Sequence, residues 1–302
     1  MRAPAIRAAA LRRLLRPGFL LLGAVLLAGC AAAATGGSAA DEPDDRTVRT
    51  HAAGAGRTAV VVHPPTAGPG APLVVVLHGA GGSAADARAH LGWDALGERD
   101  GFVVAYPDGV DGTWNAGSCC GRARDLGVDD AAYLHELREQ LIAEDAVDAG
   151  RVYAVGFSNG AMMSYRWACG RPGDLAGIGS VAGTLLVDCP EPAPLTVAAV
   201  QGTADDRVPI GGRPQRGFPP LDATLAPFLA AAGCAGDPTV IVEAQATVST
   251  WGCAAGRTVT RDVIDGAPHE WPGAGRDDTG TSDDPLDATG FLWARLRSAS
   301  GA

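Results

Sequence analysis

Positive charge is scarce in this sequence, and lysine is absent. The 24 basic residues, all arginine, are outnumbered by 34 acidic residues, and the formal net charge is -10. Five arginines and no acidic residue lie in residues 1–29, so the rest of the chain is more acidic still. Such a surface repels nucleic acid and anionic lipid, and we expect neither as a partner. We attach no function to the absence of lysine.

Metal-binding spacings and internal repeats are also missing. No two cysteines are separated by two residues, and no histidine lies close in the sequence to the adjacent pair Cys119 and Cys120. A zinc site needs such a ligand set, so we expect no metal. The chain shows no internal repeat, which excludes the repeat-protein architectures, and no second folded domain is evident.

The N-terminal apolar run, from Phe19 to Ala28, is too short to span a membrane comfortably as a permanent helix. It ends in Leu-Ala-Gly before Cys30, which resembles the cleavage box of bacterial lipoproteins. We therefore predict that residues 1–29 are a signal peptide and that Cys30 is diacylated. Two acyl chains would anchor the protein stably, since more than one chain is needed for that. The protein would then lie on the outer face of the bacterial cell membrane. Secretion after cleavage elsewhere among the alanines is the alternative.

Residues 30–56 are rich in alanine, glycine, serine and aspartate and offer nothing from which to build a core. We predict that they form an acidic, disordered tether. Residues 57–302 are long enough to bury most of their surface and are predicted to form a single catalytic domain. We assume a monomer, since the sequence does not address the oligomeric state.

Apolar, β-type runs alternate with helix-type segments throughout this domain. The alternation predicts an α/β fold in which a mostly parallel central sheet is covered by helices on both faces. The expected strands are residues 58–62, 73–77, 102–106, 152–155, 178–181, 195–200 and 258–264, and the expected helices are residues 84–91, 129–147, 161–169, 221–232 and 286–296.

One strand-to-helix junction carries the sequence Gly156-Phe157-Ser158-Asn159-Gly160. The pattern G-x-S-x-G at such a junction is typical of a nucleophile elbow, in which a strained bend lifts the serine hydroxyl above the sheet edge. The pattern alone is weak in a chain with 42 glycines. Its placement between a strand and a helix makes Ser158 the candidate nucleophile.

A serine nucleophile needs a base, and the base needs an orienting carboxylate. Only one of the six histidines, His269, follows Ser158, and it lies on a loop after an expected strand. Asp205 follows the carboxyl end of another expected strand, where α/β sheets place their chemistry. We select Asp205 over its neighbour Asp206, although an aspartate at such a place often only caps a turn.

The oxyanion of an acyl-transfer intermediate needs two backbone N–H donors. One is expected from Asn159, directly after the nucleophile. The other is expected from Ala80, in the glycine-rich loop that begins with His78-Gly79 after an early strand.

Taken together, these motifs resemble the polyhydroxybutyrate depolymerase-like esterases of the α/β-hydrolase superfamily, relatives of feruloyl and acetylxylan esterases, and in particular their short lipoprotein members. The resemblance extends over about residues 57–297 and implies Ser158 as nucleophile, Asp205 as triad acid and His269 as base. Its segments are GFVVAYPDG (101–109), Trp114-Asn115, Cys119-Cys120-Gly121, Val128-Asp129-Asp130, GFSNGAMMS (156–164), GTAD (202–205) and HEWPG (269–273).

Two positions depart from this family. Gln201 stands where the family usually has His, which we expect to alter packing beneath the acid loop. Glu270 stands where the family usually has Thr, and its negative charge beside His269 is expected to favour a protonated imidazole or to disfavour anionic substrates.

Without Cys30, six cysteines remain, and in an exported chain they suggest up to three disulfides, for which fifteen pairings are possible. Closeness in the sequence and the family pattern favour two of these bonds and leave the last two cysteines for each other. The favoured pairs are Cys169 with Cys189 and Cys234 with Cys253, and the remaining pair is Cys119 with Cys120.

The resemblance implies hydrolysis of carboxylic esters through an acyl-enzyme, without a cofactor. Hydroxyalkanoate oligomers and feruloyl or acetyl esters of polysaccharides are the expected substrates, and Trp114 and Trp271 are candidate substrate-lining residues that could equally serve packing. We also expect the loop of residues 107–127 and residues 211–220 to border the substrate. The alternatives are a cell-envelope acyltransferase with the same triad, a catalytically silent surface-binding lipoprotein, and a peptidase.

Overall fold

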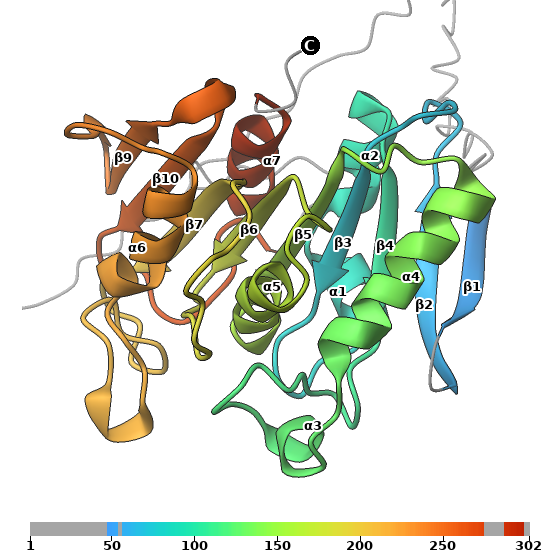
Figure 1. The fold of residues 1–302 in the computed structure, drawn as a ribbon, viewed down its shortest axis with the longest axis horizontal. Helices are drawn as coiled ribbons and strands as arrows, with labels where there is room; N and C mark the ends of the chain where they lie inside the picture. The colour runs from blue at the N-terminus through green and yellow to red at the C-terminus, as the bar shows by residue number, and fades with distance from the viewer. Residues whose placement is uncertain (1–46, 54–55, 275–286, 299–302) are drawn as a thin grey trace, which may run out of the picture. The chain divides into compact units, whose positions relative to one another are not determined.

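The computed structural model describes residues 47–53, 56–274 and 287–298 (Figure 1). The predicted signal peptide, Cys30 and most of the predicted tether lie outside these residues. Among the residues described, no helix is long and apolar enough to cross a membrane.

A mixed sheet forms the centre of the described structure, and its strands follow one another in the order β1-β2-β4-β3-β5-β6-β7-β10-β9-β8. The six strands from β4 to β10 in this order run parallel, and two antiparallel strands extend the sheet at each end. The strands are β1 (Thr47–Ala53), β2 (Arg57–His63), β3 (Leu73–Leu77), β4 (Val103–Pro107), β5 (Val152–Phe157), β6 (Gly177–Val181), β7 (Thr196–Gly202), β8 (Thr239–Glu243), β9 (Ala246–Gly252) and β10 (Thr258–Ile264).

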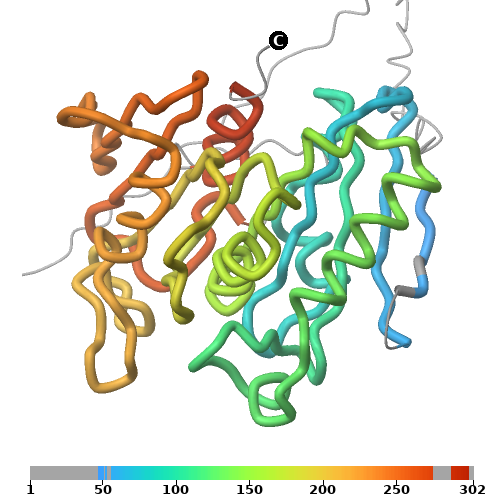
Figure 2. The backbone as a smooth tube through the Cα atoms, in the orientation of Figure 1, coloured from blue at the N-terminus to red at the C-terminus, as the bar shows by residue number. Residues whose placement is uncertain are grey.

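Helices cover both faces of the sheet, as predicted. The face formed by Leu73, Val75 and Leu77 packs against α4, α5 and α6, whereas the face formed by Val74 and Val76 packs against α1, α2 and α7 (Figure 2). The helices are α1 (Ala84–His90), α2 (Trp93–Asp100), α3 (Gly121–Asp125), α4 (Asp130–Asp145), α5 (Asn159–Gly170), α6 (Leu221–Ala231) and α7 (Ala288–Ser298), with 3-10 turns at Pro214–Arg216 and Ala254–Gly256. The fold is that of the α/β-hydrolases.

The N-terminal boundary of the folded part differs from the prediction. Residues 47–53, which we assigned to the disordered tether, form β1 and pair antiparallel with β2. Backbone pairing along β2 provides the hydrogen bonds, and the Arg49 guanidinium forms an ion pair with Asp145 of α4. An edge strand of this kind needs no apolar side chains of its own, which is why composition alone pointed to a tether.

A second difference lies between α6 and β10, where the hairpin of β8 and β9 was not predicted. β8 has the sequence TVIVE, and all five of its residues are exposed at the sheet edge. Its β-branched residues favour a strand, so the sequence contained a signal that we did not use.

The six described cysteines pair as the family pattern suggested. Cys169 of α5 is bonded to Cys189, which precedes β7, and Cys234 after α6 is bonded to Cys253 after β9. The third bond joins Cys119 and Cys120, and the peptide between them is cis.

Asp262 is a buried carboxylate in β10, and its Oδ1 has no hydrogen-bond partner in the described structure. Burial raises its pKa to about 6, a shift that Arg295 opposes and Glu243 reinforces. The folded-state pKa therefore lies above the unfolded value of about 4. Below pH 4 the Asp262 carboxyl is protonated in the folded and the unfolded state, and it then lowers the free energy of unfolding least. That free energy falls as the pH rises through about 6.

We therefore predict that Asp262→Asn raises the melting temperature at pH 8 and leaves it nearly unchanged at pH 4. Thermal unfolding followed by circular dichroism at the two pH values measures this difference. Asp237→Asn, at an exposed aspartate, is the matched control and is expected to change neither melting temperature. An equal gain at both pH values for Asp262→Asn would contradict the assignment.

Candidate active site

The turn between β5 and α5 adopts the strained backbone of a nucleophile elbow. Ser158 has φ 52° and ψ -115°, a conformation that is costly for a residue with a side chain. The flanking glycines permit it: a Cβ on Gly160 would lie 2.2 Å from the Leu77 carbonyl oxygen, and one on Gly156 would lie 2.4 Å from the Gly160 carbonyl carbon. The Ser158 N–H donates to the Val181 carbonyl at 2.9 Å, which ties the turn to β6.

The three residues proposed for a triad meet above the carboxyl ends of the parallel strands. Nε2 of His269 lies 2.9 Å from the Ser158 Oγ, and Nδ1 lies 2.8 Å from Oδ2 of Asp205. Ser158 follows β5, Asp205 follows β7, and His269 follows β10, so three strand ends provide one residue each. Because Asp205 and not the exposed Asp206 contacts the imidazole, the choice between the two carboxylates agrees with the geometry.

Asp205 is buried, and hydrogen bonds keep it ionised. Burial acts to raise its pKa, but hydrogen bonds from His269 and from the Val208 and Arg207 N–H groups, together with the charge of His269, outweigh that effect, so the pKa lies below the ordinary value for Asp. The two backbone N–H groups donate to Oδ1 at 2.8 and 2.9 Å. An ionised carboxylate at this position can orient the imidazole and stabilise it when it becomes protonated.

The two expected oxyanion donors are free to bind a ligand. Neither the Asn159 N–H nor the Ala80 N–H donates a hydrogen bond within the part of the chain that the structure describes. The Gly79–Ala80 peptide is held in place from its carbonyl side, because the Gly79 oxygen accepts hydrogen bonds from Nδ1 of His78 at 2.8 Å and from the Gly82 N–H at 3.1 Å. A peptide fixed at its carbonyl is also fixed at its N–H, so this donor is preorganised.

The tautomer of His78 follows from its partners. Nε2 accepts a hydrogen bond from the Gly109 N–H at 3.0 Å, so the proton of the neutral ring is on Nδ1, which donates to the Gly79 carbonyl. Burial lowers the pKa of His78, and the neutral form is retained. Gly109 belongs to the YPDG segment, whose Asp108 also accepts a hydrogen bond from the Ala84 N–H at 2.7 Å. The role of this segment was not evident from the sequence.

Of the two roles left open for Trp114, lining the substrate and packing, the structure supports packing. Its side chain is fully buried, and Nε1 donates to the His78 carbonyl at 3.0 Å. The Asn159 side chain holds the Trp114 backbone by two hydrogen bonds, of 2.7 Å to its N–H and 2.9 Å from Nδ2 to its carbonyl. Trp114 therefore joins the loop that begins with His78-Gly79, which we call the oxyanion loop, to the first turn of α5. Most of the indole surface is apolar, which favours this buried position over an exposed one.

The same two roles were open for Trp271, and it is also buried. Its Nε1 donates to Thr289 Oγ1 at 3.0 Å, and that hydroxyl donates to the Leu91 carbonyl at 2.6 Å. The indole anchors the His269 loop against α7, at only 4% exposure. Glu270 between these residues is exposed.

Arg57 is a further residue that the sequence did not single out. Its guanidinium forms an ion pair with Asp130 at 2.5 Å, donates twice to the Asp108 carbonyl at 2.8 and 3.2 Å, and lies 3.7 Å from the centroid of the Tyr133 ring. Asp130 in turn accepts a hydrogen bond from the Asn115 N–H at 2.6 Å. These contacts fix both ends of the loop that contains Trp114. No local motif marks the arginine for this role, because its partners lie 51 and 73 residues away.

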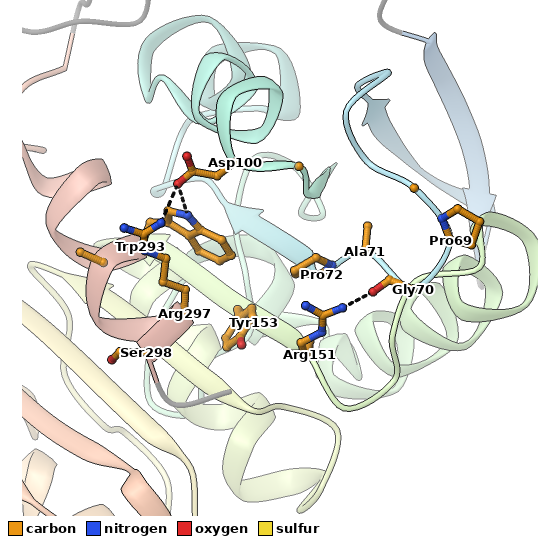
Figure 3. Close-up of a pocket in the computed structure, with 13 residues that line it drawn as sticks. Pro69, Gly70, Ala71, Pro72, Asp100, Arg151, Tyr153, Trp293, Arg297 and Ser298 are labelled. Carbon is orange, nitrogen blue, oxygen red and sulfur yellow. Dashed lines mark hydrogen bonds and ion pairs between the residues drawn. The ribbon is translucent and has the colours of Figure 1, made fainter. Parts of the chain in front are cut away.

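Two hollows differ in their relation to the site. One of about 710 Å³ lies at the opposite end of β5 from Ser158, where Arg151 donates to the Gly70 carbonyl and Trp293 to Asp100 (Figure 3). The other, of about 600 Å³, is lined by residues 185–188 and by residues 214 and 217–220. It lies beside the loop after β6, the strand that holds the elbow, and its walls include part of the segment expected to border the substrate.

The family model for "Esterase PHB depolymerase" matches residues 57–208. The chain belongs to this family. The match includes the elbow and Asp205 and ends before His269. The resemblance stated from the sequence motifs is thereby confirmed, apart from its lipoprotein aspect, which concerns residues that the structure does not describe.

Relatives of known name agree with this membership. A protein of Nocardia uniformis subsp. tsuyamanensis that carries the name esterase NocK is 32% identical over 237 residues, which cover 68% of this chain and 66% of that protein. Poly(3-hydroxyalkanoate) depolymerase C of Paucimonas lemoignei is 36% identical over 117 residues, 37% of this chain and 28% of that protein. The chain thus matches just under two thirds of the first relative and less than a third of the second.

A solved structure supports the fold. The acetyl xylan esterase from Aspergillus awamori superposes with a TM-score of 0.58 at 15% identity, covering 74% of this chain and 94% of that chain. At this identity the likeness concerns the fold alone.

We predict that Trp114→Phe lowers kcat about tenfold and leaves KM nearly unchanged, because it removes the N–H that holds the His78 carbonyl and not a substrate contact. Losing a buried hydrogen bond and part of a ring should also cost about 1–3 kcal/mol of stability. Steady-state kinetics on a p-nitrophenyl ester and thermal unfolding measure the two effects. Trp251→Phe, on the distant strand β9, is the control. A rise in KM with an unchanged kcat would instead indicate that Trp114 contacts the substrate.

Proposed function

We propose that this protein is an extracytoplasmic serine esterase that hydrolyses carboxylic esters through a Ser158-His269-Asp205 triad. The observation that carries the proposal is the pair of contacts from one imidazole, 2.9 Å to Ser158 Oγ and 2.8 Å to Asp205 Oδ2, at a nucleophile elbow. Membership in an esterase family supports the same activity.

In the first step, Ser158 Oγ attacks the ester carbonyl carbon while His269 Nε2 takes the hydroxyl proton. The carbonyl oxygen becomes an oxyanion, which accepts hydrogen bonds from the Asn159 and Ala80 N–H groups. The intermediate collapses when the bond to the alcohol oxygen breaks, and His269 gives its proton to that oxygen. The alcohol leaves, and the acyl group remains on Ser158 as an ester.

In the second step, water attacks the acyl-enzyme carbonyl, and His269 takes one of its protons. The same two N–H groups bind the new oxyanion, and collapse returns the proton to Ser158 Oγ and releases the carboxylic acid. Asp205 remains ionised in both steps, orienting the ring and stabilising the imidazolium. Every proton is exchanged between groups in the site and water, so the reaction needs no cofactor.

The hollow lined by the loop after β6 supports one class of substrate. Polar and apolar atoms share its surface, and Asp188 is the one charged side chain among its described lining residues: Leu185, Leu186, Val187, Asp188, Pro214, Gly217, Phe218, Pro219 and Pro220. An uncharged, partly apolar chain or ring suits these walls better than a free anion. Hydroxyalkanoate oligomers and feruloyl or acetyl esters of polysaccharides both meet this description, and we propose them as the substrates.

The location outside the cytoplasm is part of the proposal. Three disulfides among the described cysteines are typical of proteins from oxidising compartments. Residues 1–29 are proposed as the signal peptide and Cys30 as the lipidated residue that attaches the enzyme to the membrane.

We predict that the full chain, kept in solution with mild detergent, hydrolyses p-nitrophenyl esters from acetate to octanoate and that Ser158→Ala lowers kcat by at least about 1,000-fold. The loss is large because no other group in the site can form the acyl-enzyme. Release of p-nitrophenol measures it, and the dependence on acyl length reports the size of the acyl site.

Ser298→Ala, at an exposed serine of α7 near the opposite end of the sheet, is the matched control and should retain full activity. A phosphonate ester inhibitor should label the wild type at one residue, Ser158, as identified by peptide mass spectrometry. An absence of both turnover and labelling in a folded, oxidised protein would overturn the proposed function.

A further inference from the structure

Gln201 lies at the carboxyl end of β7 and contacts the acid of the proposed triad. Its side chain is buried, with 2% exposure, and Nε2 donates to Oδ2 of Asp205 at 2.9 Å and to the Val208 carbonyl at 2.7 Å. A carboxamide NH₂ group carries two hydrogens, so both donors are used. The contact is more than the packing beneath the acid loop that the sequence led us to expect.

The orientation of this amide follows from its partners. Both facing atoms, the carboxylate oxygen of Asp205 and the carbonyl oxygen of Val208, are acceptors only, so the NH₂ group and not the amide oxygen must face them. A flipped amide would place three oxygen atoms together without a hydrogen between them. The assignment of Nε2 is therefore set by chemistry.

The carboxylate of Asp205 is fully engaged by four donors. Oδ2 receives Gln201 and His269, whereas Oδ1 receives the N–H groups of Arg207 and Val208. The two backbone donors alone would fix Oδ1 but would still let the carboxylate rotate, so that Oδ2 changes its position. Gln201 supplies the contact that prevents this, because it approaches Oδ2 from β7, the strand before the acid loop.

We propose that Gln201 is a positioning residue for the triad acid, fixing the carboxylate plane of Asp205 so that Oδ2 faces His269. This inference rests on the proposed function, since it assigns Gln201 a role in the same site. The amide is neutral at every accessible pH, so it orients the carboxylate without adding a charge to the acid–base pair. Its second bond, to Val208, closes the acid loop back onto β7 and fixes the amide itself.

An alternative is that Gln201 serves only to satisfy the backbone of the acid loop. The two roles predict different behaviour on substitution. A residue that only supports the loop would affect stability, and activity would fall only as folded protein is lost. A residue that positions Asp205 would affect kcat and its pH dependence in protein that is still folded.

The experiment compares Gln201→Leu and Gln201→Glu with the wild-type full chain. The Leu variant removes both donors at similar volume, and we expect kcat to fall on the order of 10- to 100-fold with KM within about threefold, as for loss of a hydrogen bond to a charged group. The Glu variant keeps the shape, but burial and the facing Asp205 carboxylate favour the protonated form of the new carboxyl group. While protonated it donates one hydrogen bond and preserves the contact, and once ionised it repels Asp205, so we expect its kcat/KM to fall at alkaline pH where that of the wild type stays level.

Gln245→Glu is the matched control, since this exposed glutamine between β8 and β9 undergoes the same chemical change away from the triad acid. It should leave both kcat and the pH profile unchanged. Thermal unfolding of every variant shows whether the protein is folded in the assay. If the Leu variant does not fold, the nearly isosteric Glu variant still decides through its pH profile.

Full kcat in a folded Leu variant, or a Glu variant whose pH profile coincides with that of the wild type, would overturn the inference. A readout without substrate keeps this result separate from the proposed function. Proton NMR of the Nδ1 hydrogen of His269 follows the titration of the imidazole directly, and its midpoint should rise in the Leu variant, because an Asp205 carboxylate that loses a donor stabilises the imidazolium more strongly. If the wild type hydrolyses no ester but this midpoint rises, the positioning role survives while the proposed function fails.

Discussion

The strained backbone of Ser158 is the constraint on which the rest of the site depends. A residue with a side chain holds φ 52° and ψ -115° only if its surroundings exclude every easier conformation. β5 and α5 are packed on either side of it, and the absence of a Cβ on Gly160 lets the helix start against the end of β3. The same close contact brings the oxyanion loop, which begins where β3 ends, next to the nucleophile. One steric condition therefore sets the position of both the hydroxyl and the two N–H donors.

Around this elbow, the groups that hold the two expected oxyanion donors are neutral. His78 is held in one tautomer by Gly109, and it fixes the peptide of Ala80. Asn159 holds Trp114 with its side chain, which leaves its backbone N–H for the proposed oxyanion. Neutral partners keep the field of the site unchanged over a range of pH, so that the charge that develops during the reaction meets dipoles that are already aligned.

Much of this arrangement could be predicted from the sequence, and the omissions have physical causes. Short-range patterns located the elbow and the residues proposed as acid and base, because each follows a strand end that the apolar runs reveal. The choice between substrate lining and packing stayed open for the two tryptophans because a single sequence does not say which side of a loop faces the protein. Arg57 went without a role because its partners lie 51 and 73 residues away and meet it only in the tertiary fold. Gln201 was expected only to alter packing, because the sequence does not say that its side chain turns toward Asp205, although that residue is close in the chain. β1 was missed because an edge strand is held mainly by backbone hydrogen bonds.

The hairpin of β8 and β9 lies in the sequence between the acid and the base, yet it contributes no residue to the triad contacts. Its outer strand is solvent-exposed along its whole length, and only β9 pairs with β10. The hairpin therefore lengthens the chain between Asp205 and His269 without contributing to the contacts among the three residues of the proposed triad. The turn of the hairpin is fastened to the chain directly after β10, because the Gln245 carbonyl accepts the Asp265 N–H at 2.7 Å. An affinity tag or a fluorophore is therefore better attached at the exposed residues 235–237, which precede β8.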